Sequence, residues 1–132
     1  MIGLISCVKS KANKRCEAKD MYVSPLFKYM YAYAKKRCKE VYILSAKYGL
    51  LSENDIISPY DLTLNTMSEF RKKEWGDKVM IQLSDRFDIK STSFLFLGGA
   101  NYIKYLRLPL LRQPLKGLSL GYRLKYLKNN KS

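Results

Sequence analysis

Three short apolar runs constrain the fold of this chain more than any other feature of the sequence. Ile2–Cys7, Val41–Ser45 and Ser93–Leu97 are rich in β-branched or aromatic residues and have the length of buried strands. Stretches with helical periodicity separate them. This alternation predicts an α/β fold, a three-layer domain with a mostly parallel sheet of three or four strands and helices on both faces. At 132 residues, we expect one domain spanning 1–132.

Capping signals mark the start of two predicted helices. Ser24 precedes Pro25, which suits the first helical position, and a basic last turn, KKRCK, ends this helix. Its apolar face is expected to comprise Leu26, Phe27, Met30, Tyr31, Ala34 and Cys38. The segment Thr66–Glu69 has the pattern of a capping box, so a second helix should run from there to about Asp85. Along it we expect burial of Met67, Phe70, Val79 and Leu83, with Trp75 partly covered.

Glycine and proline punctuate the last third of the chain. We expect a helix over Ala100–Leu106, directly after the Gly98-Gly99 turn. A short fourth strand is expected around Leu110–Arg112. A basic helix should follow at about 119–129.

The C-terminal helix interleaves cations with Tyr122 and Tyr126, which lie one helical turn apart. Such a pattern can hold phosphates and stack bases, and the expected contacts to a nucleic-acid backbone are Lys116, Arg123, Lys125 and Lys128. It is also typical of a helix that packs through Leu120, Leu124 and Leu127 while its charges are solvated. Opposite faces of one helix can serve both purposes.

The net charge of +14 points to a polyanionic partner, either nucleic acid or an anionic membrane surface. No apolar run approaches the roughly 20 residues that span a bilayer, and the start of the chain lacks the pattern of a signal peptide. We therefore expect a cytoplasmic protein without a membrane association. Its expected partner is nucleic acid, with DNA favoured over RNA.

The chain has no histidine and three cysteines, Cys7, Cys16 and Cys38, without CxxC spacing. This excludes Ser-His and Cys-His nucleophiles, HExxH metalloproteases and a four-ligand zinc site. We expect reduced thiols, with Cys7 and Cys38 facing the core, and neither a metal nor a cofactor. Acid–base chemistry would fall to Asp, Glu, Lys, Tyr or a bound water.

Ligands of open parallel sheets bind outside the carboxyl ends of the strands. Here those ends carry Ser6–Lys11, Ser45–Asp61 and Gly98–Tyr102, and the 46–65 loop is long enough to be functional. The candidate substrate-binding residues on these segments are Ser6, Lys9, Ser10, Lys11, Ser45, Tyr48, Asn101 and Tyr102. The first segment could bind phosphate or form a solvated loop, and it is not a P-loop because GxxxxGK is absent. The turn at Gly98-Gly99 could admit an anion or serve packing.

Asp61, Lys47 and Tyr60 are the candidate catalytic residues. A carboxylate in a domain this basic can orient water or stabilise a cationic transition state. Two alternatives stay open: Asp61 caps the following residues, or it pairs with a lysine. Glu53 and Asp55 are rival carboxylates in the same loop, whereas Glu69 is expected to act as a cap.

The ordered motifs ISCVKSK, AKDMYVSPLF, ILSAKYGLL, PYDLTLNTM and PLKGLSLGYRLKYL cover nearly the whole chain. On these motifs the chain resembles a family of short bacterial and phage-borne proteins known as a domain of unknown function. More distantly, the strand–SAKYG–PYD core resembles the uracil-DNA-glycosylase-like domain of archaeosine-type tRNA-modifying enzymes. It is also similar to the YaaA-type peroxide-stress DNA-binding proteins.

The glycosylase-like resemblance implies a base pocket at the carboxyl ends of the strands and cleavage of an N-glycosidic bond in a modified base of DNA or RNA. It assigns the carboxylate role to Asp61, base stacking to Tyr60 or Tyr48, and base-edge contacts to Asn101 or Ser45. The chain lacks the GQDPYH-type and HPSPLS-type motifs of uracil glycosylases. A non-catalytic nucleic-acid-binding or stress-protection module and a small nucleotide-binding enzyme are the alternative functions.

Overall fold

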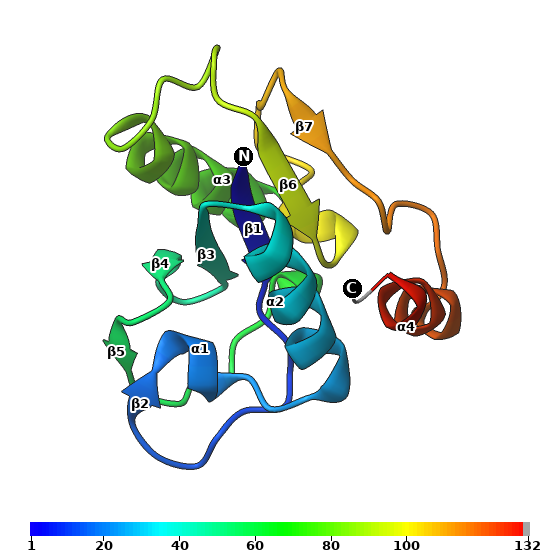
Figure 1. Cartoon of the computed structure of the whole chain (residues 1–132). Coiled ribbons are helices and arrows are strands. Elements are labelled where there is room, and N and C mark those ends of the chain that lie inside the picture. Colours follow the sequence, from blue (N-terminus) through cyan, green and yellow to red (C-terminus); the bar gives the residue numbers. More distant parts are fainter. Residues whose placement is uncertain (131–132) are drawn as a thin grey trace.

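The computed structural model describes residues 1–130 and contains a five-stranded sheet in the order β4-β3-β1-β6-β7 (Figure 1). Its strands are β1 (Ile2–Ser6), β3 (Glu40–Ser45), β4 (Gly49–Ser52), β6 (Phe94–Leu97) and β7 (Leu111–Arg112). The central strand β1 pairs in parallel with β3 and β6, and β7 continues the parallel set beside β6. Only β4 runs antiparallel, against β3. The predicted mostly parallel α/β architecture is confirmed.

Helices cover both faces of this sheet, with α2 (Pro25–Arg37) in front of it and α3 (Glu69–Ser84) behind it in Figure 1. All five residues of β1 are buried, as expected for a central strand that has no solvent-facing side. Ser24 caps α2 as predicted, because its Oγ accepts a hydrogen bond from Phe27 N at 3.1 Å. The helix α4 (Leu120–Asn129) lies against α2 and confirms the predicted basic C-terminal helix.

Of the five strands of this sheet, β4 was not predicted, and it lies within the segment that we expected to be a long loop. A tight turn after β3 leads to Gly49, whose φ of +75° suits glycine, and the chain then returns as β4. Farther on, β5 (Ile56–Ile57) pairs with β2 (Cys16–Glu17), which precedes the short helix α1 (Ala18–Met21). Helix α3 covers β4, and Gln82 Oε1 accepts a hydrogen bond from Leu50 N at 2.9 Å. Strand pairing therefore orders parts of the 46–65 segment.

The start of α3 differs from the predicted capping box. Ser68 is the N-cap, because its Oγ accepts a hydrogen bond from Arg71 N at 3.2 Å, whereas Thr66 ends the 3₁₀ turn η1 (Leu64–Thr66). This places Phe70 on the solvent side of the helix, where its side chain is 71% exposed. Val79 and Leu83 are buried as predicted, and Trp75 is fully packed instead of partly covered.

The expected helix over Ala100–Leu106 is wrong. Only a 3₁₀ turn forms there, η2 (Ala100–Tyr102), and hydrogen-bonded turns follow it as far as Tyr105. Leu106 and Leu108 are both buried, and this spacing of two suits an extended chain returning to begin β7. The strand predicted around Leu110–Arg112 is confirmed at its last two residues.

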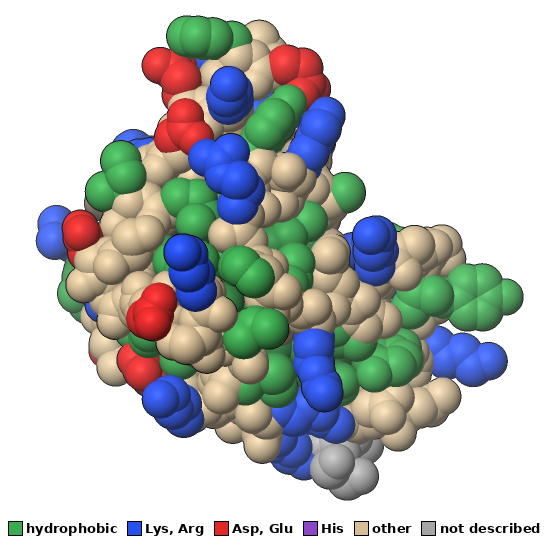
Figure 2. Space-filling model, turned by 90° about the horizontal axis from the view of Figure 1, so that it is seen from above, with side chains coloured by type: hydrophobic (Ala, Val, Ile, Leu, Met, Phe, Trp, Pro, Cys, Tyr) green, Lys and Arg blue, Asp and Glu red, His purple; other side chains and the backbone are tan. Residues whose placement is uncertain are grey.

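Two further expectations about burial need correction. Leu120, at the first turn of α4, is 61% exposed, whereas Leu127 is the residue that packs into the core. Cys7 is buried as expected, but Cys38 is the C-cap of α2 and is only partly covered. Figure 2 views the edge at which the parallel strands begin and shows Lys and Arg side chains scattered over it between hydrophobic and neutral surface.

Candidate functional site

The parallel strands β1, β3 and β6 end together because Ile5 lies between Ile43 and Leu97 in the sheet register. Beyond these ends, Gly98 has φ +149°, and Ser6 Oγ accepts a hydrogen bond from Gly99 N at 3.1 Å. A Cβ placed on Gly98 would lie 1.9 Å from Ser6 Oγ. The loop after β6 therefore sits directly on the end of β1, and Ser6 itself is buried.

A hydrogen-bonded group of hydroxyls holds the PYD segment against the end of β3. Ser45 Oγ donates to the Tyr60 hydroxyl at 2.8 Å, and the hydroxyls of Tyr60 and Tyr22 lie 2.6 Å apart. Ser45 Oγ also accepts from Tyr48 N at 3.0 Å, while Trp75 Nε1 donates to the Ser45 carbonyl at 2.9 Å. Burial is the main cause that raises the pKa of Tyr22 and of Tyr60 well above the ordinary value. Tyr60 is thus a neutral, anchored hydroxyl.

Above this group lies a pocket of about 300 Å³. Its polar lining includes two lysines and one carboxylate, from Lys9, Lys11 and Asp61. The Lys11 ammonium lies 4.6 Å from the centroid of the Tyr60 ring and 3.3 Å from the Lys9 carbonyl oxygen. A cation over an aromatic face is attracted by the ring quadrupole, so the anchored Tyr60 positions Lys11 at the pocket.

Tyr102 forms a buried wall of the same pocket. Its hydroxyl accepts hydrogen bonds from Cys7 Sγ at 3.4 Å and from Leu64 N at 3.3 Å. Burial, together with the neighbouring Cys7, raises the pKa of Tyr102 to about 12. Cys7 is therefore a buried packing residue beside Tyr102, whose hydroxyl stays protonated at neutral pH.

Asp61 is exposed at the pocket, and within residues 1–130 no side chain or backbone N–H bonds to its carboxylate. The capping role that Asp61 could have filled belongs to Thr63, whose Oγ1 accepts a hydrogen bond from Asn65 N at 3.1 Å. Asp61, Thr63 and Asn65 all line the pocket. Asp61 and Thr63 precede η1, whereas Asn65 lies within that 3₁₀ turn, so no simple periodicity in the sequence could have identified Thr63 and Asn65.

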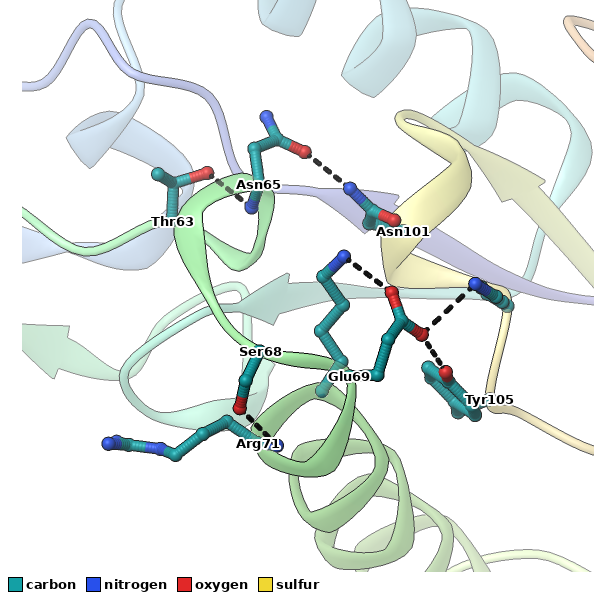
Figure 3. A network of polar contacts seen from close by, with 9 residues as sticks. Thr63, Asn65, Ser68, Glu69, Arg71, Asn101 and Tyr105 are labelled. Atoms are coloured by element: carbon teal, nitrogen blue, oxygen red, sulfur yellow. Dashed lines mark hydrogen bonds and ion pairs between the residues drawn. The ribbon is translucent and has the colours of Figure 1, made fainter.

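Figure 3 shows how the neighbouring segment is held in place. Asn101 Nδ2 donates to Asn65 Oδ1 at 2.8 Å, which joins η2 to η1. Glu69, at the first turn of α3, accepts from Lys72 and Lys104, each at 3.1 Å, and from the Tyr105 hydroxyl. Sequence reasoning expected Glu69 to cap its helix and missed this contact. Its partners Lys104 and Tyr105 lie 35 and 36 residues away, so no local pattern indicates it.

Removing the Glu69 charge should loosen this connection in a pH-dependent way. The hydrogen bond from Tyr105, followed by those from Lys104 and Lys72, lowers the pKa of Glu69 from 4.5 to about 2. A carboxyl group whose pKa is lower in the folded than in the unfolded protein stabilises the folded state at pH values above its unfolded-state pKa. This stabilisation is lost as the pH falls through the folded-state pKa. We expect Glu69→Gln to lower the urea midpoint at pH 7, and the difference from the unmodified protein to disappear near pH 2. Glu74→Gln, at an exposed position of the same helix, should leave the midpoint unchanged at both pH values.

The remaining predicted site residues lie around this pocket without lining it. Ser10 is exposed, and its carbonyl accepts from Val23 N at 3.1 Å. Tyr48 meets the Tyr60 ring edge-on with centroids 5.7 Å apart, and the exposed Lys47 ammonium lies 5.3 Å from the Tyr48 ring. Structurally, Lys9, Lys11, Asp61 and Tyr102 meet in one pocket, whereas Lys47 and Ser10 lie outside it.

The basic residues near the C-terminus divide into two kinds. Arg123 turns inward, where its Nη1 donates to the Gly98 carbonyl at 2.6 Å and its Nε to the Leu118 carbonyl at 2.8 Å. Lys116, Lys125 and Lys128 are exposed. Arg123 therefore supports the loop after β6, and the lysines are the accessible cations.

The described residues contain no group of three or more His, Cys, Asp or Glu side chains placed to hold a metal ion. Over the same residues, no helix is both long and apolar enough to cross a membrane. The residues that line the pocket supply two ammonium groups, one carboxylate, a hydroxyl and an amide.

The family model of DUF6884, described as a family of unknown function, matches residues 2–129. The chain belongs to this family. The match includes every residue of the pocket, the hydrogen-bonded hydroxyls of Ser45, Tyr22 and Tyr60 beneath it, and the exposed lysines of α4. A search of curated proteins found no match.

Proposed function

We propose that this DUF6884 protein acts on nucleic acid as an N-glycosylase-like enzyme that releases a modified base. The observation that carries the proposal is the Asp61 carboxylate, which lines a pocket beside Lys9 and Lys11 without a bonding partner in the described chain. A carboxylate left unpaired among cations is available to a substrate. The resemblance of the strand–SAKYG–PYD core to uracil-DNA-glycosylase-like domains supports the same assignment.

The size and lining of the pocket suit one extruded base. A volume of about 300 Å³ is at the lower end for small-molecule sites, which commonly measure about 300–1,000 Å³. Enzymes that act on a base remove it from the stack and read its edge by hydrogen bonds. Thr63 and Asn65 supply hydroxyl and amide groups for that edge, and the Lys9 and Lys11 ammonium groups attract the adjoining phosphates.

Hydrolysis of the N-glycosidic bond requires a water molecule and a general base beside the nucleobase in this pocket. Asp61 accepts a proton from the water as the water oxygen bonds to C1′ of the sugar. The C1′–N bond breaks, the base leaves with its electron pair and takes up a proton from bulk water, and Asp61 then returns its proton to the solvent. The positive charge that develops on the sugar is stabilised by the Asp61 carboxylate, whereas Lys11 lies on the phosphate side.

The direct test is release of free base from nucleic acid. We expect the protein to liberate a base from at least one member of a panel of DNA and RNA that includes hypermodified phage DNA, as measured by chromatography and mass spectrometry. Unmodified duplex DNA is the matched control and should release none. Absence of release from every member of a broad panel would contradict the enzymatic proposal.

A non-catalytic nucleic-acid-binding module is the second candidate, because the exposed lysines of α4 need no chemistry to bind phosphates. We expect the double variant Lys125→Gln/Lys128→Gln to weaken DNA binding. The slope of log Kd against log salt should also fall by about two, since each phosphate contact contributes about 0.9. Fluorescence anisotropy over a salt series measures both.

Lys36→Gln/Lys39→Gln, at exposed positions in the last turn of α2 and after it, is the charge-matched control. It removes the same net charge and should change the slope by clearly less. Equal effects of the two double variants would show that binding depends on overall charge and not on α4.

A further inference from the structure

A second cavity lies at the opposite edge of the sheet from the candidate site. It measures about 620 Å³, within the common range for ligand pockets of about 300–1,000 Å³. Met1 and Leu95, which line it, stand before β1 and near the start of β6. The 300 Å³ pocket lies instead beyond the carboxyl ends of these strands, so the two cavities are separate.

Two tyrosines from different helices form one side of this second cavity. The hydroxyls of Tyr33 on α2 and Tyr126 on α4 are 3.1 Å apart, and their ring centroids are 5.9 Å apart. Burial is the first cause that raises the pKa of Tyr33, so its hydroxyl stays protonated at neutral pH. Pro114 and Leu95 add apolar surface. This lining suits a flat apolar body such as a nucleobase.

Two arginines supply the charge. The Arg37 guanidinium lies 3.6 Å from the centroid of the Tyr33 ring, and its Nη1 and Nη2 donate to the carbonyls of Tyr33 at 3.2 Å and of Asn130 at 2.9 Å. Its plane is therefore set before any ligand arrives. Arg112, on the edge strand β7, is exposed and lines the cavity from another element. Arginine is suited to phosphate because its planar donors can bind two oxygens at once.

No carboxylate is among the described residues that line this cavity. In Figure 2, which faces this edge of the molecule, Lys and Arg side chains border apolar surface in the lower right of the view, where no acidic side chain is visible. An anion with an aromatic group is the ligand that such a surface complements.

From the tyrosine pair, the fixed Arg37 and the exposed Arg112, we infer a second binding site for a 5′-mononucleotide unit, either free or at the end of a strand. The base lies against the tyrosines, and the phosphate bonds to the arginines. This site does not depend on base release in the pocket at Asp61. It is a binding site without an assigned chemical step.

The test is binding of dAMP to the full chain by isothermal titration calorimetry. We expect saturable binding that Arg112→Gln weakens by about tenfold or more, the effect of losing a charge-assisted contact. Arg71→Gln, which removes the same charge from an exposed position on α3, should change the Kd by less than about twofold. Deoxyadenosine, which lacks the phosphate, should bind about tenfold more weakly than dAMP.

Each contrary result has a defined meaning. Absence of dAMP binding at millimolar concentration overturns the site. Inorganic phosphate that binds as tightly as dAMP overturns the aromatic part of the inference. If Lys11→Gln abolishes dAMP binding and Arg112→Gln leaves it unchanged, the nucleotide binds in the pocket at Asp61, and the second site is overturned. Base release by the Arg112→Gln variant is measured separately, so failure here leaves the glycosylase proposal standing.

Discussion

Gly98→Ala is expected to lower the free energy of unfolding by about 3 kcal/mol, the combined cost of a strained φ and an overpacked contact. Gly98 has φ +149°, and a Cβ there would lie 1.9 Å from Ser6 Oγ and 2.5 Å from Ser6 Cβ. Ser6 ends the central strand, so neither it nor the neighbouring backbone can move without disturbing the sheet. Urea unfolding followed by tryptophan fluorescence measures the change, because Trp75 is buried.

Gly117→Ala is the matched control for this substitution. Gly117 also has positive φ, +79°, but a Cβ there would meet no atom within 4 Å. Its replacement should therefore cost only the conformational strain, about 1 kcal/mol. Equal losses at the two positions would show that the contact between Gly98 and Ser6 has no energetic role. A Gly98→Ala protein as stable as the unmodified one would contradict the observed geometry.

Asp61→Asn is expected to reduce base release by about 100-fold or more, the usual effect of removing a positioned general base. The carboxylate makes no hydrogen bond in the described chain, so its replacement by an amide of the same shape should leave stability within about 0.5 kcal/mol. Nucleic-acid binding should stay equal or become tighter, because a negative charge is removed next to Lys9 and Lys11. Single-turnover release assays and anisotropy separate the two effects.

Asp55→Asn tests the rival carboxylate of the same segment. Asp55 Oδ2 accepts a hydrogen bond from Ser52 N at 2.8 Å in the turn after β4, and it does not line the pocket. Base release by this variant should stay within about twofold of the unmodified protein. If Asp55→Asn abolished release while Asp61→Asn preserved it, the catalytic assignment would move to Asp55.

The alternation of apolar runs and helical patterns was sufficient to predict the parallel sheet, because a strand buried on both faces has a recognisable composition. The Ser24-Pro25 helix start was also predictable, since a cap depends on neighbours three residues away. The antiparallel strand β4 was missed because Gly49–Ser52 is short, and nothing in its local sequence shows that it pairs with β3. The 100–106 segment was mistaken for a full helix because it forms only a 3₁₀ turn and further tight turns, and the chain from Leu106 onward packs in a non-helical form that local propensity does not predict.

The candidate site was predictable in part. Three strand ends had to converge, which directed attention to Lys9, Lys11, Asp61 and Tyr102, and these residues line one pocket. Which side of a loop faces that pocket depends on packing, so the sequence could not separate them from Ser10 and Lys47. It also could not distinguish Arg123, which bonds to two carbonyls, from the exposed lysines around it.

The sequence by itself determined the class of fold, the edge of the sheet at which the 300 Å³ pocket lies, and the absence of histidine from the chain. These conclusions follow from composition, local periodicity and chain order, which are properties of the sequence. Tertiary structure alone decided the anchoring of Tyr60 under Lys11, the contact of Gly98 with Ser6 and the meeting of Tyr33 with Tyr126. Each of these joins residues far apart in the chain, and such contacts depend on how the elements pack.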